Sequence, residues 1–230
     1  MECTLALVGD GYTLVAADRN AARSIICFKK DEDKVTVLDS HKIMGSSGAI
    51  RRPAVPSRLR RDSSPGMMAV VVSSSILTET LRAGAQADTV CFTEYVQKNM
   101  ALYEISNGLK LSTPAAASFV RNELAVALRK GPYQTNLLLG GYDAEHGATL
   151  YYLDYLASSN KVNYGCHGYV SSFVLSIFDR EWVPNMSEAQ GLELLKKCID
   201  EIQVRFLVHM PAFTVKIVDK DGVRVLEQPK

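Results

Sequence analysis

Predicted strands and predicted helices follow one another in blocks along this chain, and the order of the blocks restricts the possible folds. Because strands do not alternate one for one with helices, a doubly wound parallel sheet is disfavoured. We predict an α+β fold with two antiparallel sheets and a pair of helices on each outer face. The predicted order is strands 3–9, 12–17, 34–38 and 41–46, helices 88–105 and 113–129, strands 135–141 and 149–155, helices 168–181 and 187–206, and strands 213–218 and 223–226.

Turn and cap residues support these boundaries. Asp10-Gly11 between two apolar runs is a strong signal for a tight hairpin. Asp88 is a predicted N-cap, and so is Thr113, which precedes a proline at the first helical position. Ser187 and Gln190 match a capping box. The helix after it carries an apolar stripe, which we interpret as core packing: Leu192, Leu195, Cys198, Ile199, Ile202 and Phe206.

Composition and length are typical of one globular domain, or at most two small ones, and we predict a single domain spanning 1–230. The chain has 230 residues, of which 47% are hydrophobic and 22% charged, with a formal net charge of +1. This balance gives no indication of a nucleic acid or an anionic membrane as partner. No apolar run approaches the roughly 18 residues of a membrane-spanning helix, and we expect no signal peptide.

Cysteines and histidines are scattered along the chain without metal-ligand spacing. An odd number of dispersed cysteines indicates reduced thiols in an intracellular protein. We interpret the histidines as packing or surface residues, and we expect no metal site and no cofactor. The positions are Cys3, Cys27, Cys91, Cys166 and Cys198, and His41, His146, His167 and His209.

Several stretches of the chain resemble one known family. They include "TLALVGDGYTLVAADRNA", "DTVCFTEYVQKNMALYEISNG", "TPAAASFVRNELA", "NLLLGGYDAEHGATLYYLDYLAS" and "FDREW". Together they resemble the beta subunits of the 20S proteasome, and among these the non-catalytic beta-4 (beta type 2) subunits. The resemblance covers nearly the whole chain and implies the four-layer αββα sandwich of the N-terminal-nucleophile hydrolases, in agreement with the predicted order of elements.

The resemblance also implies partners and a role. It implies an obligate hetero-oligomer, with beta-3 and beta-5 subunits as neighbours in a beta ring, an alpha ring on one side and a second beta ring on the other. The implied role is structural, in a particle that degrades proteins in an ATP- and ubiquitin-linked pathway. We expect no nucleic acid and no membrane among the partners, and a location in the cytoplasm and nucleus.

Active members of this family use an N-terminal threonine whose own α-amine accepts the hydroxyl proton. A lysine, an acidic residue and a backbone N–H assist, and by resemblance Lys34, Asp18 and Gly48 match these three parts. Glu2 stands at the position of the nucleophile. The resemblance therefore implies an inactive member in which the three matching residues are vestigial. Asp18 and Lys34 are then expected to remain as a structural ion pair.

Further supporting residues of active members are missing, and one alternative nucleophile is present. The Asp-x-x-Ser pair of active members falls on Phe206 and His209. If Met1 and Glu2 were removed, Cys3 would become an N-terminal nucleophile, which defines a cysteine hydrolase as the alternative function. Cys3 would lie one residue out of register with the matching lysine and so on the opposite strand face. We therefore interpret Cys3 as a buried strand cysteine.

Residues 49–84 have no counterpart in the family pattern and form an anomalous insertion. The segment contains six arginines, no lysine, no aromatic residue and only two acidic residues. It could be a surface loop, a basic patch for a partner or RNA, or sequence from an unspliced intron. We favour the loop or the intron, because the segment lacks aromatic side chains that could stack on single-stranded nucleic acid.

The stretch Ala22 to Lys30 matches a loop that lies near substrate and neighbouring subunits in the family. By this resemblance, Ile26 and Phe28 are candidate neighbour contacts. We expect one of these two side chains to be partly exposed in the isolated chain and covered on assembly.

Overall fold

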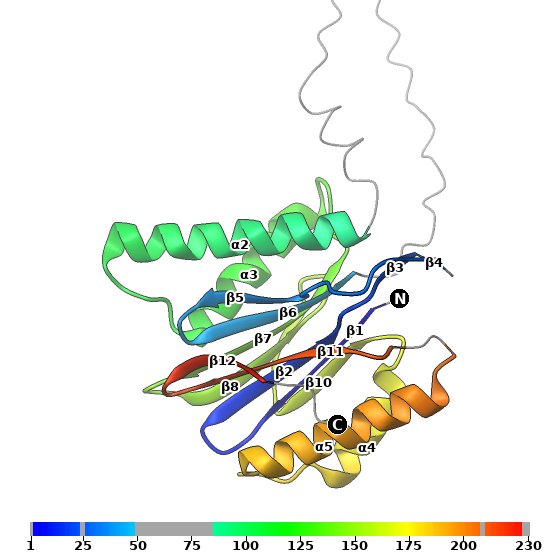
Figure 1. The fold of residues 1–230 in the computed structure, drawn as a ribbon. Coiled ribbons are helices and arrows are strands. Elements are labelled where there is room, and N and C mark those ends of the chain that lie inside the picture. Colours follow the sequence, from blue (N-terminus) through cyan, green and yellow to red (C-terminus); the bar gives the residue numbers. More distant parts are fainter. Residues whose placement is uncertain (1, 24–25, 49–84, 208–209, 227–230) are drawn as a thin grey trace, which may run out of the picture.

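The computed structural model describes residues 2–23, 26–48, 85–207 and 210–226. In these residues, two five-stranded antiparallel sheets lie face to face, with one pair of helices on each outer side (Figure 1). The predicted four-layer αββα sandwich is confirmed. One sheet has the strand order β10-β1-β2-β11-β12 and the other the order β5-β6-β7-β8-β9.

The first sheet is built around the N-terminal hairpin. β1 (Cys3–Val8) and β2 (Tyr12–Asp18) pair directly, and Gly11 adopts a φ of 72° in the turn between them. Glycine suits this left-handed conformation because it has no Cβ. The sheet is completed by β10 (Tyr164–Gly168), β11 (Phe213–Asp219) and β12 (Gly222–Leu226). The predicted hairpin is confirmed, whereas β10 was not predicted: residue 168 ends this strand and does not begin a helix.

The second sheet follows the sequence order of its strands. Neighbouring strands pair antiparallel throughout. Short connections join all of these pairs except β6 and β7, which are separated by residues 49–134. The strands are β5 (Val35–Asp39), β6 (Lys42–Gly48), β7 (Thr135–Asp143), β8 (Gly147–Leu153) and β9 (Ser159–Val162). A separate two-stranded sheet, β3 (Ala21–Arg23) with β4 (Ile26–Lys29), follows β2 and was not predicted.

Four helices in the described residues cover the outer faces. α2 (Ala85–Asn107) and α3 (Thr113–Leu128) lie over the second sheet, and α4 (Ser171–Glu181) and α5 (Glu188–Arg205) lie over the first (Figure 1). The core-packing stripe of α5 is confirmed: Leu195, Cys198, Ile199 and Ile202 are buried, and Leu192 and Phe206 pack against the same core partly buried. Leu194, which was not predicted, is buried as well.

The helix caps agree with the sequence only in part. The capping box at Ser187 and Gln190 is present as predicted. The N-cap of α3 is Ser112, whose hydroxyl accepts from the N–H of Ala115, so Thr113 is the first helical residue and not the cap. Asp88 is also not a cap, because α2 already includes residues 85–87.

Two glycines allow the sheets to approach closely. A Cβ atom on Gly45 would lie 2.6 Å from Cγ2 of Thr4 in the facing sheet. A Cβ atom on Gly140 would lie 2.6 Å from Cγ2 of Thr13. Polar groups at this interface find partners in the opposite sheet: the buried His167 ring donates from Nε2 to the carbonyl of Leu137 at 3.1 Å. Burial lowers the pKa of His167 to about 4, so the ring is neutral near pH 7.

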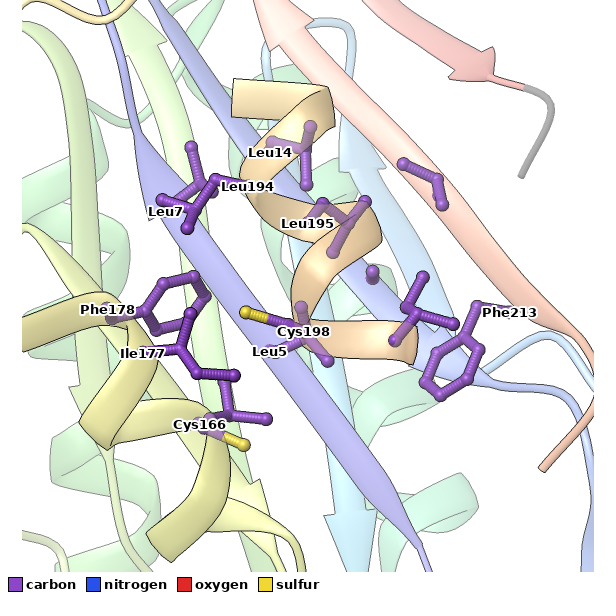
Figure 2. Packing of buried hydrophobic residues seen from close by; sticks show 14 of the residues in the cluster. Leu5, Leu7, Leu14, Cys166, Ile177, Phe178, Leu194, Leu195, Cys198 and Phe213 are labelled. Atoms are coloured by element: carbon purple, nitrogen blue, oxygen red, sulfur yellow. The ribbon is translucent and has the colours of Figure 1, made fainter. Parts of the chain in front are cut away.

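Apolar side chains fill the space between the first sheet and its two helices (Figure 2). Strand residues such as Leu5 and Leu14 contribute from one side, and Phe178 and Leu195 contribute from α4 and α5. All four are fully buried. This packing fixes the position of β1, and therefore of the chain segment just before it.

Two phenylalanines of α4 provide a matched test of this packing. Phe178 is 0% exposed and Phe173 is 44% exposed. Phe178→Ala should lower the free energy of unfolding by about 3–5 kcal/mol, because it removes a buried ring and leaves a cavity. Phe173→Ala should cost the isolated chain less than about 1 kcal/mol. Urea unfolding followed by circular dichroism measures both, and equal losses would contradict the described packing.

Candidate functional site

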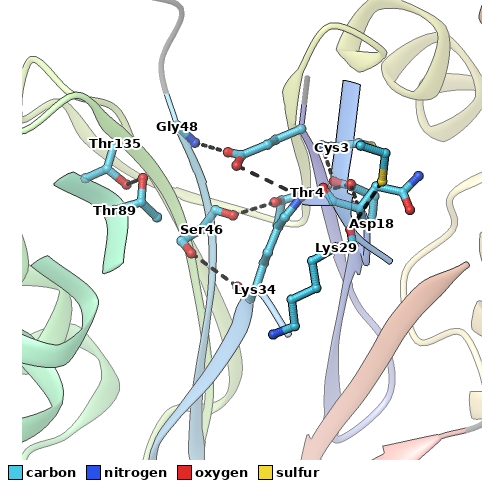
Figure 3. A network of polar contacts seen from close by, with 12 residues as sticks. Cys3, Thr4, Asp18, Lys29, Lys34, Ser46, Gly48, Thr89 and Thr135 are labelled. Carbon is cyan, nitrogen blue, oxygen red and sulfur yellow. Dashed lines mark hydrogen bonds and ion pairs between the residues drawn. The ribbon is translucent and has the colours of Figure 1, made fainter. Parts of the chain in front are cut away.

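Asp18 and Lys34 form a buried ion pair at the end of β2. The Nζ atom of Lys34 lies 2.8 Å from Oδ2 of Asp18, and the two side chains are 7% and 0% exposed (Figure 3). Lys34 also donates to the carbonyl of Asn20 at 2.8 Å. The Asp18 carboxylate accepts the backbone N–H groups of Cys3 and Asn20, at 2.8 and 3.2 Å. The structure thus places Asp18 and Lys34 in the expected ion pair.

Glu2 and Gly48 meet beside this ion pair. The backbone N–H of Gly48, at the end of β6, donates to Oε2 of Glu2. In Figure 3 this hydrogen bond is the dashed line that starts at the labelled Gly48. The other carboxylate oxygen of Glu2 lies 4.0 Å from Nζ of Lys34. Glu2, which by resemblance stands at the nucleophile position, therefore directs its carboxylate at the N–H of the glycine that by resemblance matches the oxyanion hole.

Side chains next to Glu2 fix this end of β1 against the second sheet. The hydroxyl of Thr4 donates to the carbonyl of Ser46 at 3.1 Å, and the hydroxyl of Ser46 donates to the carbonyl of Lys34 at 3.2 Å (Figure 3). Because side chains alternate along a strand, Glu2 and Thr4 share the face that looks toward the second sheet. The alternation therefore directs the side chain of Glu2 toward the second sheet, where Gly48 lies.

Cys3 faces the other way. Its side chain is 0% exposed and belongs to the core under α4 and α5, together with Cys166 and Cys198. Burial, reinforced by the neighbouring Cys166 thiol, raises the pKa of Cys3 well above its ordinary value. A buried thiol of this kind is a poor nucleophile, because the thiolate is the reactive form. The prediction of a buried strand cysteine is confirmed.

Other predicted positions contribute little to this site. Phe206 caps the C-terminus of α5 and its ring lies 6.5 Å from that of Tyr169, while His209 lies outside the described residues. Phe28 is 70% exposed, and the side chain of Ile26 lies outside what the structure describes. The insertion at 49–84 also lies outside the described residues.

Metal and membrane features were searched in the same residues. Within the described ranges, no group of three or more His, Cys, Asp or Glu side chains could hold a metal ion. None of the helices that the structure describes combines the length and apolar character needed to cross a membrane.

The fold and the site together define the class. Two facing antiparallel sheets between helix pairs, with a lysine–aspartate pair behind the start of the first strand, are the framework of the N-terminal-nucleophile type. The family model described as "Proteasome subunit" matches residues 80–218. The chain belongs to the proteasome subunit family.

Curated relatives assign it to the beta subunits. "Proteasome subunit beta type-2-A" of Arabidopsis thaliana is 46% identical, over 97% of this chain and 92% of its own length. "Proteasome subunit beta type-2" of Dictyostelium discoideum is 39% identical, over 98% of this chain and 97% of its own. "Probable proteasome subunit beta type-4" of Schizosaccharomyces pombe is 36% identical, over 97% and 98%.

One functional contact was missed from the sequence. Glu2 was interpreted only as the absence of a nucleophile, whereas its carboxylate also binds the N–H of Gly48. The available signal was the period-2 alternation of the first strand, which places Glu2 on the same face as Thr4 and away from Cys3. The partner of Glu2, 46 residues further along the chain, could not be found in this way.

The ion pair can be tested by removing one charge. Asp18→Asn should lower the free energy of unfolding by about 3 kcal/mol or more, because a buried lysine loses its charged partner. The control is Glu201→Gln, which breaks an exposed pair with Arg205 and should cost less than about 1 kcal/mol. Urea unfolding compares the two. If Asp18→Asn costs no more than the control, the pair does not organise this site.

Proposed function

We propose that this chain is a non-catalytic beta subunit of the 20S proteasome core particle. It occupies one position in a beta ring and helps to wall off the chamber in which other subunits degrade proteins. The observation that carries this proposal is the hydrogen bond from the N–H of Gly48 to the carboxylate of Glu2, the residue that by resemblance stands at the nucleophile position. Membership of the proteasome subunit family, with relatives that match nearly the whole chain, supports assembly with other proteasome subunits.

The chemistry explains why Glu2 cannot replace the nucleophile. The reaction of active members needs a hydroxyl and an α-amine on one N-terminal residue, so that the amine can accept the hydroxyl proton. Glu2 offers a carboxylate in place of the hydroxyl, and this group also covers the donor that would stabilise an oxyanion. Cys3, the nearest thiol, is buried on the opposite face of β1.

Exposed apolar side chains on the outer helices support assembly into a larger particle. Leu102 and Ile105 on α2 are 59% and 81% exposed, and Val204 at the end of α5 is 78% exposed. Exposed apolar side chains that lie close together are typical of surfaces that bind other proteins, and Leu102, Tyr103 and Ile105 lie within about one turn of α2. By resemblance, the neighbours are beta-3 and beta-5 subunits, an alpha ring and the opposite beta ring, in a particle of the cytoplasm and nucleus.

Activity-based labelling of the assembled particle tests the proposed function. The purified core particle is treated with a peptide electrophile that reacts with N-terminal nucleophiles, and each subunit is analysed by mass spectrometry. Catalytic subunits of the same particle serve as the positive control. We expect this chain to be present in the particle and unlabelled. A label on Cys3, or a stable lone monomer as the only form in the cell, would overturn the proposal.

Assembly should also cover Phe28. Phe28 lies in β4 of the small β3–β4 sheet, and its ring is 70% exposed in the isolated chain. Amide hydrogen exchange of 26–30 should slow by at least about tenfold when the chain enters the particle, because burial at an interface suppresses local opening. The exposed turn at 144–146 provides an internal comparison. Unchanged exchange at 26–30 would exclude Phe28 as a neighbour contact.

A further inference from the structure

Asn107 is the last residue of α2, and Gly108 follows it in the outer layer of the sandwich (Figure 1). Gly108 has a φ of 68°, a left-handed conformation that commonly ends helices and suits glycine. Both residues are exposed to solvent. An asparagine followed by a glycine is chemically labile, because glycine has no side chain that hinders attack by its own backbone nitrogen on the asparagine amide.

The reaction of such a pair consumes only water and needs no enzyme. The Gly108 nitrogen loses its proton to solvent and bonds to Cγ of Asn107. The bond from Cγ to Nδ2 then breaks, and the leaving group takes up one proton and departs as ammonia. The succinimide ring that remains adds one water molecule and opens. Opening at Cγ gives aspartate, whereas opening at the backbone carbonyl carbon gives isoaspartate.

Two hydrogen bonds hold the reacting groups in the helical arrangement. The side-chain amide of Asn107 donates from Nδ2 to the carbonyl of Tyr103 at 2.9 Å. The backbone N–H of Gly108, which supplies the attacking nitrogen, donates to the carbonyl of Glu104 at 2.8 Å. Ring closure needs both groups to leave these carbonyls and turn toward each other. The last turn of α2 must therefore open before the reaction can occur.

We propose that Asn107 is a site of non-enzymatic deamidation, and that opening of the last turn of α2 controls its rate. Side chains around this turn give it little support from the core. Leu102, Ile105 and Leu109 are 59%, 81% and 67% exposed. The last turn also contains no basic residue that could stabilise the negative end of the helix dipole.

The product would change the end of α2. A carboxylate at position 107 cannot donate to the carbonyl of Tyr103, and it adds negative charge at the negative end of the helix. Glu104, three residues earlier, adds repulsion between like charges. Asn107 also lines a groove of about 320 Å³ with Leu102 and Phe119. Deamidation therefore places a permanent charge beside exposed apolar side chains of α2.

The experiment follows conversion of Asn107 to aspartate and isoaspartate in the full-length chain at mildly alkaline pH, by peptide mass spectrometry. A synthetic peptide of residues 103–111 is the reference, because so short a helix is not stable in water. The native chain should react at least about tenfold more slowly than the peptide, because the closed turn blocks attack. Equal rates would show that the helix end does not protect Asn107 and would overturn the proposal.

Matched substitutions at Ile105 test the role of opening. Because this side chain is 81% exposed, Ile105→Gly and Ile105→Ala both remove it with little effect on the core. Glycine disfavours the closed turn relative to alanine, so Asn107 should react about fivefold faster in Ile105→Gly than in Ile105→Ala. Ser106→Gly and Ser106→Ala repeat the comparison at a second exposed position, in case Ile105→Gly does not fold.

Each outcome of the variant comparison decides the proposal. A faster reaction in the glycine variant of a folded pair supports control by the last turn of α2. Equal rates within the pair would overturn this control. An unmodified Asn107 in the glycine variant, while the peptide reacts, would overturn the site itself. All of these measurements concern the isolated chain, so none of them affects the labelling test of the proposed function.

Discussion

The buried carboxylate of Asp18 is the point at which three separate segments of this chain meet. It ends β2, accepts the backbone N–H at the start of β1, and pairs with the lysine that precedes β5. A charge that is fully buried is tolerated only when it is paired and hydrogen-bonded, and here both conditions are met. These contacts also set the geometry of the candidate site. They fix the start of β1, and therefore the position of Glu2, which precedes β1 and accepts a hydrogen bond from Gly48.

The sandwich was largely predictable from the sequence, because most of its elements are specified by short local patterns of residues. The Asp10-Gly11 turn, the apolar runs beside it and the capping box at Ser187 each specify a neighbouring element without reference to the rest of the fold. The strands that were missed are short and of mixed polarity, such as Ser159–Val162, or are defined by distant pairing, such as β10 beside β1. Their signal is tertiary and does not appear in local periodicity.

The residues of the candidate site and its ion pair were predictable, but the contact of Glu2 with Gly48 was not. Asp18, Lys34, Gly48 and Glu2 were identified through resemblance, and the residues alone gave no distances. The direction of Cys3 followed from strand alternation, since a shift of one residue turns a side chain to the opposite face. The contact of Glu2 with Gly48 depends on how two sheets pack, and close packing there relies on a glycine at position 45.

The proposed function uses the same residues. Asp18 and Lys34 hold the strand ends together, the carboxylate of Glu2 accepts from Gly48, and the outer helices carry exposed apolar side chains. The most direct test is the intact mass of this subunit taken from the assembled particle. Our account predicts a chain that retains Glu2 and carries no electrophile adduct. A chain that begins at Cys3 would contradict it.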